Sequence, residues 1–147
     1  MQSPRGKVIV VFKNKDQFLF TICKDTTSNC TYYIPVGGGI EFGELSIEAA
    51  KREVLEEIDQ EIENIQLLDI SENIIVFNGR KEHEIVFTYS ADFKDKKIDV
   101  AKLSAGLNDL GKRIELTWAS LQEIRNAQVK IYPPNLLETL QKIGADP

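Results

Sequence analysis

The sequence predicts an α+β fold, in which a mixed β-sheet is covered by a few helices. Segments with the alternating or β-branched pattern of strands recur along most of the chain. One amphipathic helix interrupts them before the middle, and a second amphipathic segment lies near the C-terminus. The chain has 147 residues, which is enough for one hydrophobic core, so we expect a single domain over residues 1–147.

The first quarter of the chain is expected to form three strands. Residues 7–12 (KVIVVF) are apolar and β-branched, which is typical of a buried strand. After a polar turn at 13–16, residues 17–23 return, and we expect these two strands to pair as a hairpin. Residues 24–29 predict a loop, and residues 31–34 a short strand that leads into three glycines.

The middle of the chain predicts one helix and then a long strand pair. The helix runs from Ser46 to about residue 57, and Ser46 is the better candidate for its cap. Residues 61–77 alternate as an extended strand, with a bulge or break expected near 71–73. Asn78-Gly79 is a strong hairpin signal, so residues 82–93 are expected to form the returning strand.

The last third of the chain is less regular. Residues 94–113 are polar, with a short helix expected near 100–103, and residues 114–118 predict the last strand. Ser120 is expected to cap a short helix that ends near residue 126. Asn135 is expected to cap an amphipathic helix over 136–143, which Gly144 ends.

The central helix gathers three carboxylates on one face. At about 100° per residue, Glu53, Glu56 and Glu57 fall within an arc of about 100°, and the apolar residues occupy another face. Like charges at these spacings repel one another, and divalent cations relieve the repulsion. Because carboxylate oxygens are hard ligands, we expect Mg²⁺ or Mn²⁺ on this face. The alternative is a glutamate-rich helix face that is merely solvated.

Three consecutive glycines, Gly37, Gly38 and Gly39, lie just before this helix. Glycine lets the backbone approach a ligand closely, and a backbone carbonyl such as that of Gly38 can complete the coordination shell of a metal. The alternative is an ordinary turn. Three glycines together, directly before a helix of carboxylates, favour the metal site.

The spacing of these residues resembles the Nudix box, the signature of the Nudix hydrolase family. Gly38 is followed after five residues by Glu44, and after seven more by Arg52-Glu53; Glu56-Glu57 completes the pattern. Four places depart from the family pattern without removing a carboxylate: Asp59 replaces a glycine, Gln60 replaces an apolar residue, Val36 stands where proline is common with Pro35 one residue earlier, and Leu45 stands where a small polar residue is common.

The resemblance implies the family's fold, an α/β/α sandwich with a mixed β-sheet. It also implies hydrolysis of a phosphoanhydride bond in a nucleoside diphosphate derivative, with two or more divalent ions on the helix. Glu56 and Glu57 are then the best metal ligands, and Glu53 is a ligand or the base that takes a proton from water. The family role of Arg52 is structural, in a salt bridge with Glu44 that fixes the loop. On an ideal helix Arg52 points about 100° away from Glu53.

Members of this family often recruit the base from outside the box. The candidates are Glu82, Glu84 and Glu115, although each is otherwise typical of a surface residue. Glu82 and Glu84 alternate along one strand, so we expect them to share a face. His83, the only histidine, is expected on the opposite face as a partly buried side chain, and Lys24 is a candidate phosphate contact.

The composition limits the partners. A net charge of −5 argues against binding to a nucleic acid polymer, so we expect a small nucleotide-type substrate. The apolar runs are too short to span a membrane, and the N-terminus does not read as a signal peptide. We therefore expect a cytoplasmic monomer or homodimer with no membrane partner, in which Cys23 and Cys30 are free thiols.

Two other functional classes stay open. One is a non-catalytic Nudix-fold module that binds or senses a nucleotide without cleaving it. The other is an interaction domain with an acidic helix. Because the chain keeps every carboxylate of the box, the sequence favours an enzyme over both.

Overall fold

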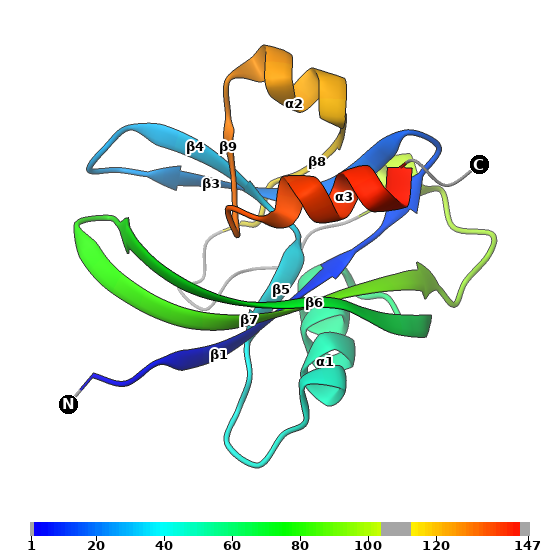
Figure 1. The fold of residues 1–147 in the computed structure, drawn as a ribbon. Coiled ribbons are helices and arrows are strands. Elements are labelled where there is room, and N and C mark those ends of the chain that lie inside the picture. The colour runs from blue at the N-terminus through cyan, green and yellow to red at the C-terminus, as the bar shows by residue number, and fades with distance from the viewer. Residues whose placement is uncertain (1, 104–112, 145–147) are drawn as a thin grey trace.

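The computed structural model of the chain describes residues 2–103 and 113–144. In these residues the chain forms two β-sheets flanked by helices (Figure 1). The first is a four-stranded sheet, whose strands in spatial order are β5 (Val36–Gly39), β1 (Arg5–Val11), β7 (Arg80–Phe93) and β6 (Ile62–Phe77). The sheet is mixed, because β1 runs antiparallel to β5 and parallel to β7.

The second sheet is built around one central strand, β3. Its strands are β2 (Lys13–Asn14), β3 (Gln17–Asp25), β4 (Cys30–Ile34), β8 (Leu116–Ser120) and β9 (Lys130–Ile131). β3 pairs antiparallel with β2, β4 and β8, and β9 joins β4 in the parallel direction. This sheet therefore brings the C-terminal part of the chain beside its N-terminal part.

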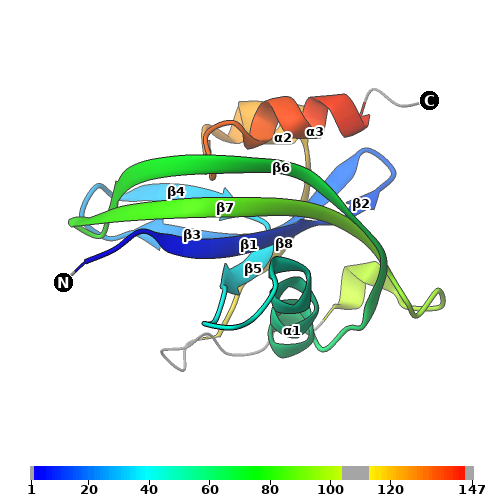
Figure 2. The same cartoon turned by 60° about the horizontal axis from the view of Figure 1, so that its bottom comes forward.

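Helices cover both faces of the four-stranded sheet (Figure 2). They are α1 (Ser46–Ile58) on one side, and α2 (Leu121–Ala127) and α3 (Leu136–Gly144) on the other. Side chains alternate along β1, so Val8 packs in the core with Val54 of α1, and Ile9 packs in the core with Leu140 of α3. The predicted α+β class and the implied α/β/α sandwich are confirmed.

The expected hairpin between residues 7–12 and 17–23 forms only near its turn. β2 pairs with the start of β3, with Lys13 opposite Phe18, and the Leu19 N–H donates to the Phe12 carbonyl over 3.2 Å. The expected pairing of the rest of the first strand is wrong, because β1 lies in the other sheet. β1 is buried from Val8 to Val11, and a strand buried on both faces is typical of a sheet interior. It therefore lies between β5 and β7, which are distant in sequence.

The long hairpin of β6 and β7 is confirmed. Asn78 (φ 52°) and Gly79 (φ 76°) both have positive φ, as a tight two-residue turn requires. The bulge expected near 71–73 is wrong, because pairing is regular there. The irregularities lie earlier, between Glu63 and Gln66 and between Leu67 and Asp69.

The C-terminal elements partly follow the prediction. The short helix near residue 100 is present as η1 (Val100–Lys102), and Ser120 caps α2 through a capping box with Glu123. β8 begins at Leu116, two residues later than predicted, and it is not the last strand, because β9 follows. The Asn135 side chain does not cap α3, because its Oδ1 accepts no hydrogen bond from the part of the chain that the structure describes, while its Nδ2 donates to Asp69.

Among the described residues, every helix is too short or too polar to cross a membrane.

Candidate active site

The helix that carries the carboxylates, α1, begins at Ser46 and ends at Ile58. Leu45 occupies the N-cap position without a side-chain cap, and the Ser46 hydroxyl lies 2.6 Å from the Tyr89 hydroxyl. The prediction that Ser46 caps this helix is therefore wrong. At the other end Asp59 adopts the left-handed conformation (φ 54°, ψ 44°), and its N–H donates to the Leu55 carbonyl over 3.0 Å.

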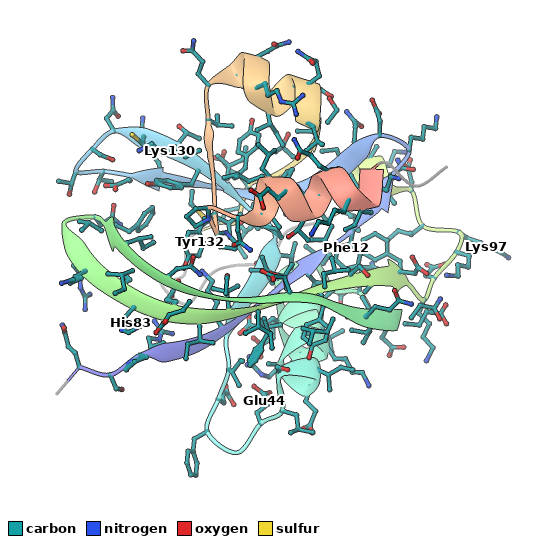
Figure 3. All side chains as sticks on the ribbon, viewed as in Figure 1. Phe12, Glu44, His83, Lys97, Lys130 and Tyr132 are labelled. Carbon is teal, nitrogen blue, oxygen red and sulfur yellow. The ribbon has the colours of Figure 1, made fainter. Side chains whose placement is uncertain are left out.

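Arg52 clamps the loop between β5 and α1 onto the helix. Its Nε and Nη2 donate to both carboxylate oxygens of Glu44, over 2.7 and 2.9 Å, and Nη2 also donates to the Gly39 carbonyl over 2.9 Å. The hydrogen bonds from Arg52 lower the pKa of Glu44 to about 2. The implied salt bridge is present, and Glu44 lies beside α1 (Figure 3).

The third guanidinium nitrogen of Arg52 turns toward the carboxylate face. Nη1 donates to Glu53 Oε1 over 2.8 Å and to Glu56 Oε2 over 3.3 Å. The expectation that Arg52 points away from Glu53 is therefore wrong, because the long side chain curls back along the helix. One arginine joins Glu44, which holds the loop, to two of the candidate metal ligands.

Glu53 lies directly against the backbone of β5. A Cβ atom added at Gly38 would lie 2.5 Å from the Glu53 carboxyl carbon and 2.6 Å from both of its oxygens. A Cβ atom at Gly37 would lie 2.0 Å from the Val8 carbonyl oxygen, because β5 and β1 are closely paired there. The two glycines thus serve different contacts: Gly37 allows the strand pairing, and Gly38 leaves room for the carboxylate.

Glu57 is a carboxylate of the cluster whose pKa is raised strongly. Burial and the negative charge of Glu53 raise its pKa to about 8, against a hydrogen bond from the Gly37 N–H and the positive charge of Lys7. Glu56 differs, because its side chain is 57% exposed, whereas that of Glu53 is 14% exposed. The cluster consists of two close, partly buried carboxylates with a third at the solvent edge.

The donors of this cluster fit a hard divalent cation. Glu53 and Glu57 supply carboxylate oxygens whose charges repel each other, and positive charge between them removes the penalty. Within the described ranges, no three acidic, histidine or cysteine side chains converge into a ready-made cage. Arg52 Nη1 donates to both Glu53 and Glu56 and therefore lies between these two carboxylates.

Of the candidates outside the box, the strand pair behaves as expected. Burial raises the pKa of the Tyr132 hydroxyl, and Glu84 and Glu82 raise it further, so both glutamates lie on the face toward Tyr132. Tyr132 Oη donates to Glu84 Oε1 over 2.6 Å, and Glu84 is buried. His83 points to the other face, where Nε2 lies 2.9 Å from Glu72 Oε2, and its side chain is 35% exposed.

The other two candidates lie at the surface. Lys24 and Glu115 are both exposed. The Cys23 thiol is affected by the charges of Lys7 and Glu57, so Cys23 faces the carboxylate cluster. Side chains alternate along a strand, and Lys24 therefore points to the opposite face of β3.

Lys7 is the residue that the sequence analysis missed. Its charge acts on Glu57 and Cys23, although it lies 50 residues before Glu57 in the chain. A signal was present, because Lys7 alternates with Ile9 and Val11 at the start of an apolar strand. A cation that shares the inward face of such a strand is unusual.

Comparison with known proteins shows to which family this chain belongs. The profile described as NUDIX domain matches residues 3–140. The chain belongs to the Nudix family. The resemblance carried by Gly38, Glu44 and Arg52 together with the three carboxylates is confirmed, and membership supports a hydrolase.

Solved structures of Nudix proteins share the fold. A NUDIX hydrolase from Nitrosomonas europaea is 22% identical, with a TM-score of 0.66, and the match covers 97% of this chain and 90% of the other. A MutT NUDIX hydrolase from Burkholderia pseudomallei is 19% identical, with a TM-score of 0.68 and coverage of 97% and 99%. A protein named ADP compounds hydrolase is 15% identical, with a TM-score of 0.62 and coverage of 96% and 73%.

Proposed function

We propose that this Nudix protein hydrolyses the phosphoanhydride bond of a small nucleoside diphosphate derivative with the help of Mg²⁺ or Mn²⁺. The single observation that carries the proposal is the carboxylate pair Glu53 and Glu57, which lies against the glycines of β5. Two partly buried like charges side by side are costly in a structural role, and a cation together with an anionic substrate turns them into a functional site.

Glu53, Glu56 and Glu57 would hold the cation, and the Gly38 carbonyl is the proposed backbone ligand. Once bound, the cation neutralises phosphate oxygens and makes a bound water more acidic. Glu53 is a ligand or the base that accepts a proton from water, and Arg52 fixes its carboxylate by the 2.8 Å hydrogen bond from Nη1. All three glutamates are therefore proposed as catalytic residues.

Arg52 and Glu44 have a structural role in this proposal. Their bidentate bond ties the loop after β5 to α1, so that Gly38 and Glu53 keep their relative positions. Because the guanidinium already donates to Glu44 and to Gly39 through Nε and Nη2, only Nη1 faces the carboxylate cluster.

A base from outside the box remains a further proposal. Glu84 keeps one carboxylate oxygen beyond the one that accepts from Tyr132, and Glu82 lies on the same face. Glu115 as a base and Lys24 as a phosphate contact stay predictions, and their exposure gives them less support than Glu84.

The proposed substrate is a free nucleotide rather than a polymer. The chain carries a net charge of −5 and so lacks the excess of positive charge that a polynucleotide backbone attracts. One neighbour of similar fold is named ADP compounds hydrolase, which agrees with a diphosphate linkage. A single domain over residues 1–147, a cytoplasmic location, no membrane partner and a monomer or homodimer all remain predictions.

The experiment that tests this function is phosphate or nucleoside monophosphate release from a panel of nucleoside diphosphate derivatives, with capped RNA included. Release that requires Mg²⁺ or Mn²⁺, stops with a chelator and favours free nucleotides supports the proposal. Glu57→Gln should abolish most of it, and the exposed Glu48→Gln on the same helix should not. Nucleotide binding without release from any compound would instead favour the non-catalytic binding module.

A further inference from the structure

Lys7 places a positive charge at the edge of the proposed active site. It lies on β1 opposite Gly39 of β5, and next to Val86 of β7. Its side chain is partly buried and shares the face of Ile9, which packs in the core that contains α3. The stem is thus packed, and the ammonium position is restricted.

The Tyr132 ring contacts the Lys7 ammonium. Lys7 Nζ lies 5.3 Å from the Tyr132 ring centroid, which is within the range of a cation–π contact. The ring itself is fixed, because Tyr132 is buried and its hydroxyl donates to the buried Glu84. Figure 3 shows Tyr132 between the two sheets.

The Lys7 charge is not matched by a close carboxylate. Across residues 2–103 and 113–144, the ion pairs of the structure do not include Lys7. Its charge nevertheless acts on Glu57 and on Cys23. Lys7 lies opposite Gly39, two residues along β5 from Gly37, whose N–H donates to Glu57. The ammonium is therefore close to the carboxylate cluster and keeps its hydrogen-bond donors for another anion.

We propose that Lys7 binds a phosphate group of the substrate beside Glu57, and that Tyr132 positions its ammonium for this contact. The inference rests on the proposed function and adds a named phosphate ligand to it. A compact ammonium with three donors suits a phosphate oxygen, and such charge-assisted bonds are short and strong.

The test is calorimetric titration with magnesium pyrophosphate, which contains the diphosphate of the proposed substrates and no base. Lys7→Met keeps an unbranched apolar stem and removes the charge, and we expect it to weaken binding by about tenfold or more. Lys7→Arg should recover part of the affinity, because it restores the charge. Lys51→Met, which removes an exposed lysine of α1, should bind as the wild type does.

Thermal melting of each variant shows whether it is folded, so a loss of binding can be assigned to the charge. Wild-type affinity in Lys7→Met overturns the inference, and so does an equal loss in Lys51→Met. Failure of the wild type to bind magnesium pyrophosphate also overturns it. If the wild type hydrolyses nucleotides and Lys7→Met binds normally, only this inference fails; if nothing is hydrolysed but Lys7→Met binds weakly, only the hydrolase proposal fails.

Discussion

At the scale of single residues, Glu57 shows most clearly why α1 is not a merely solvated helix face. Its charge is disfavoured by burial and by Glu53, and Glu53 in turn depends on Arg52 for compensation. Two carboxylates in this arrangement do not stabilise the fold, so stability alone does not explain their presence. The proposed function accounts for the pair, because a bound cation would make the interaction favourable.

Neutralising the carboxylates should separate activity from stability. Glu56→Gln and Glu57→Gln keep the shape of the side chain, and each should lower kcat by about 100-fold or more, the scale of losing an electrostatic stabiliser. Without metal and above pH 8, where Glu57 is ionised, the Tm of Glu57→Gln should hold or rise, because repulsion from Glu53 is relieved. Kinetics and melting curves check both effects, with Glu48→Gln as the control. Full activity in both variants would exclude the assignment.

Because of the Glu44–Arg52 contact, the free energy of unfolding should vary with pH in the acid range. The folded pKa of Glu44 is about 2, below its ordinary value of 4.5, so the contact stabilises the fold fully above pH 4.5. This contribution is lost as the pH falls from 4.5 toward 2. The difference in unfolding free energy between wild type and Glu44→Gln should therefore shrink over that range.

Denaturant unfolding at a series of pH values measures this difference, and Glu48→Gln, at an exposed position of α1, is the matched control. The control should show no comparable change between pH 4.5 and 2. A constant difference between wild type and Glu44→Gln across that range would show that Arg52 does not hold the Glu44 carboxylate in solution.

At the scale of elements, substitution by alanine at two neighbouring glycines of β5 should affect different properties: stability at Gly37 and activity at Gly38. Gly37→Ala places a Cβ atom against the backbone of β1, which cannot move freely, and should cost about 1–3 kcal/mol of stability or more. Gly38→Ala meets only the end of the Glu53 side chain, which can swing away. It should stay folded and lose activity. Melting curves and kinetics of both variants test this prediction. Unchanged activity in Gly38→Ala would show that Gly38 is not part of the active site.

The end of α1 offers a test of its left-handed cap. Asp59 has φ 54°, which glycine adopts without strain, so Asp59→Gly should raise stability by up to about 1 kcal/mol with little change in turnover. Gln128 caps α2 with φ 55°, and Gln128→Gly should act in the same direction. Gln60→Gly should not stabilise, because Gln60 does not have positive φ. A lower Tm in Asp59→Gly would reveal a specific bond of the Asp59 side chain.

Elements whose signals are local could be predicted, and those set by distant partners could not. Asn78-Gly79 determines its turn through backbone preferences, and the capping box of Ser120 lies within four residues. The pairing of β1 depends instead on β5 and β7, which follow it by many residues. The course of the Arg52 side chain also escaped prediction, because helix angles place Cα atoms and not the end of a long side chain.

At the scale of the whole molecule, the same division applies to the site. The three glutamates and Gly38 could be named from the sequence, because one helix and one loop carry them. Lys7 comes from β1 and Tyr132 from the segment before α3, and only the two-sheet topology brings them together. The box therefore predicts the proposed metal site, and the fold supplies the proposed phosphate contact.

The central claim is that water attacks phosphorus in a phosphoanhydride at the α1 carboxylates, and an isotope experiment tests it most directly. A nucleoside diphosphate derivative that the wild type cleaves is treated with Mg²⁺ in ¹⁸O-labelled water, and the products are examined by mass spectrometry. We expect the label in a phosphate product, at a rate that Glu57→Gln lowers by about 100-fold. Label found only in a sugar or base product would contradict the claim.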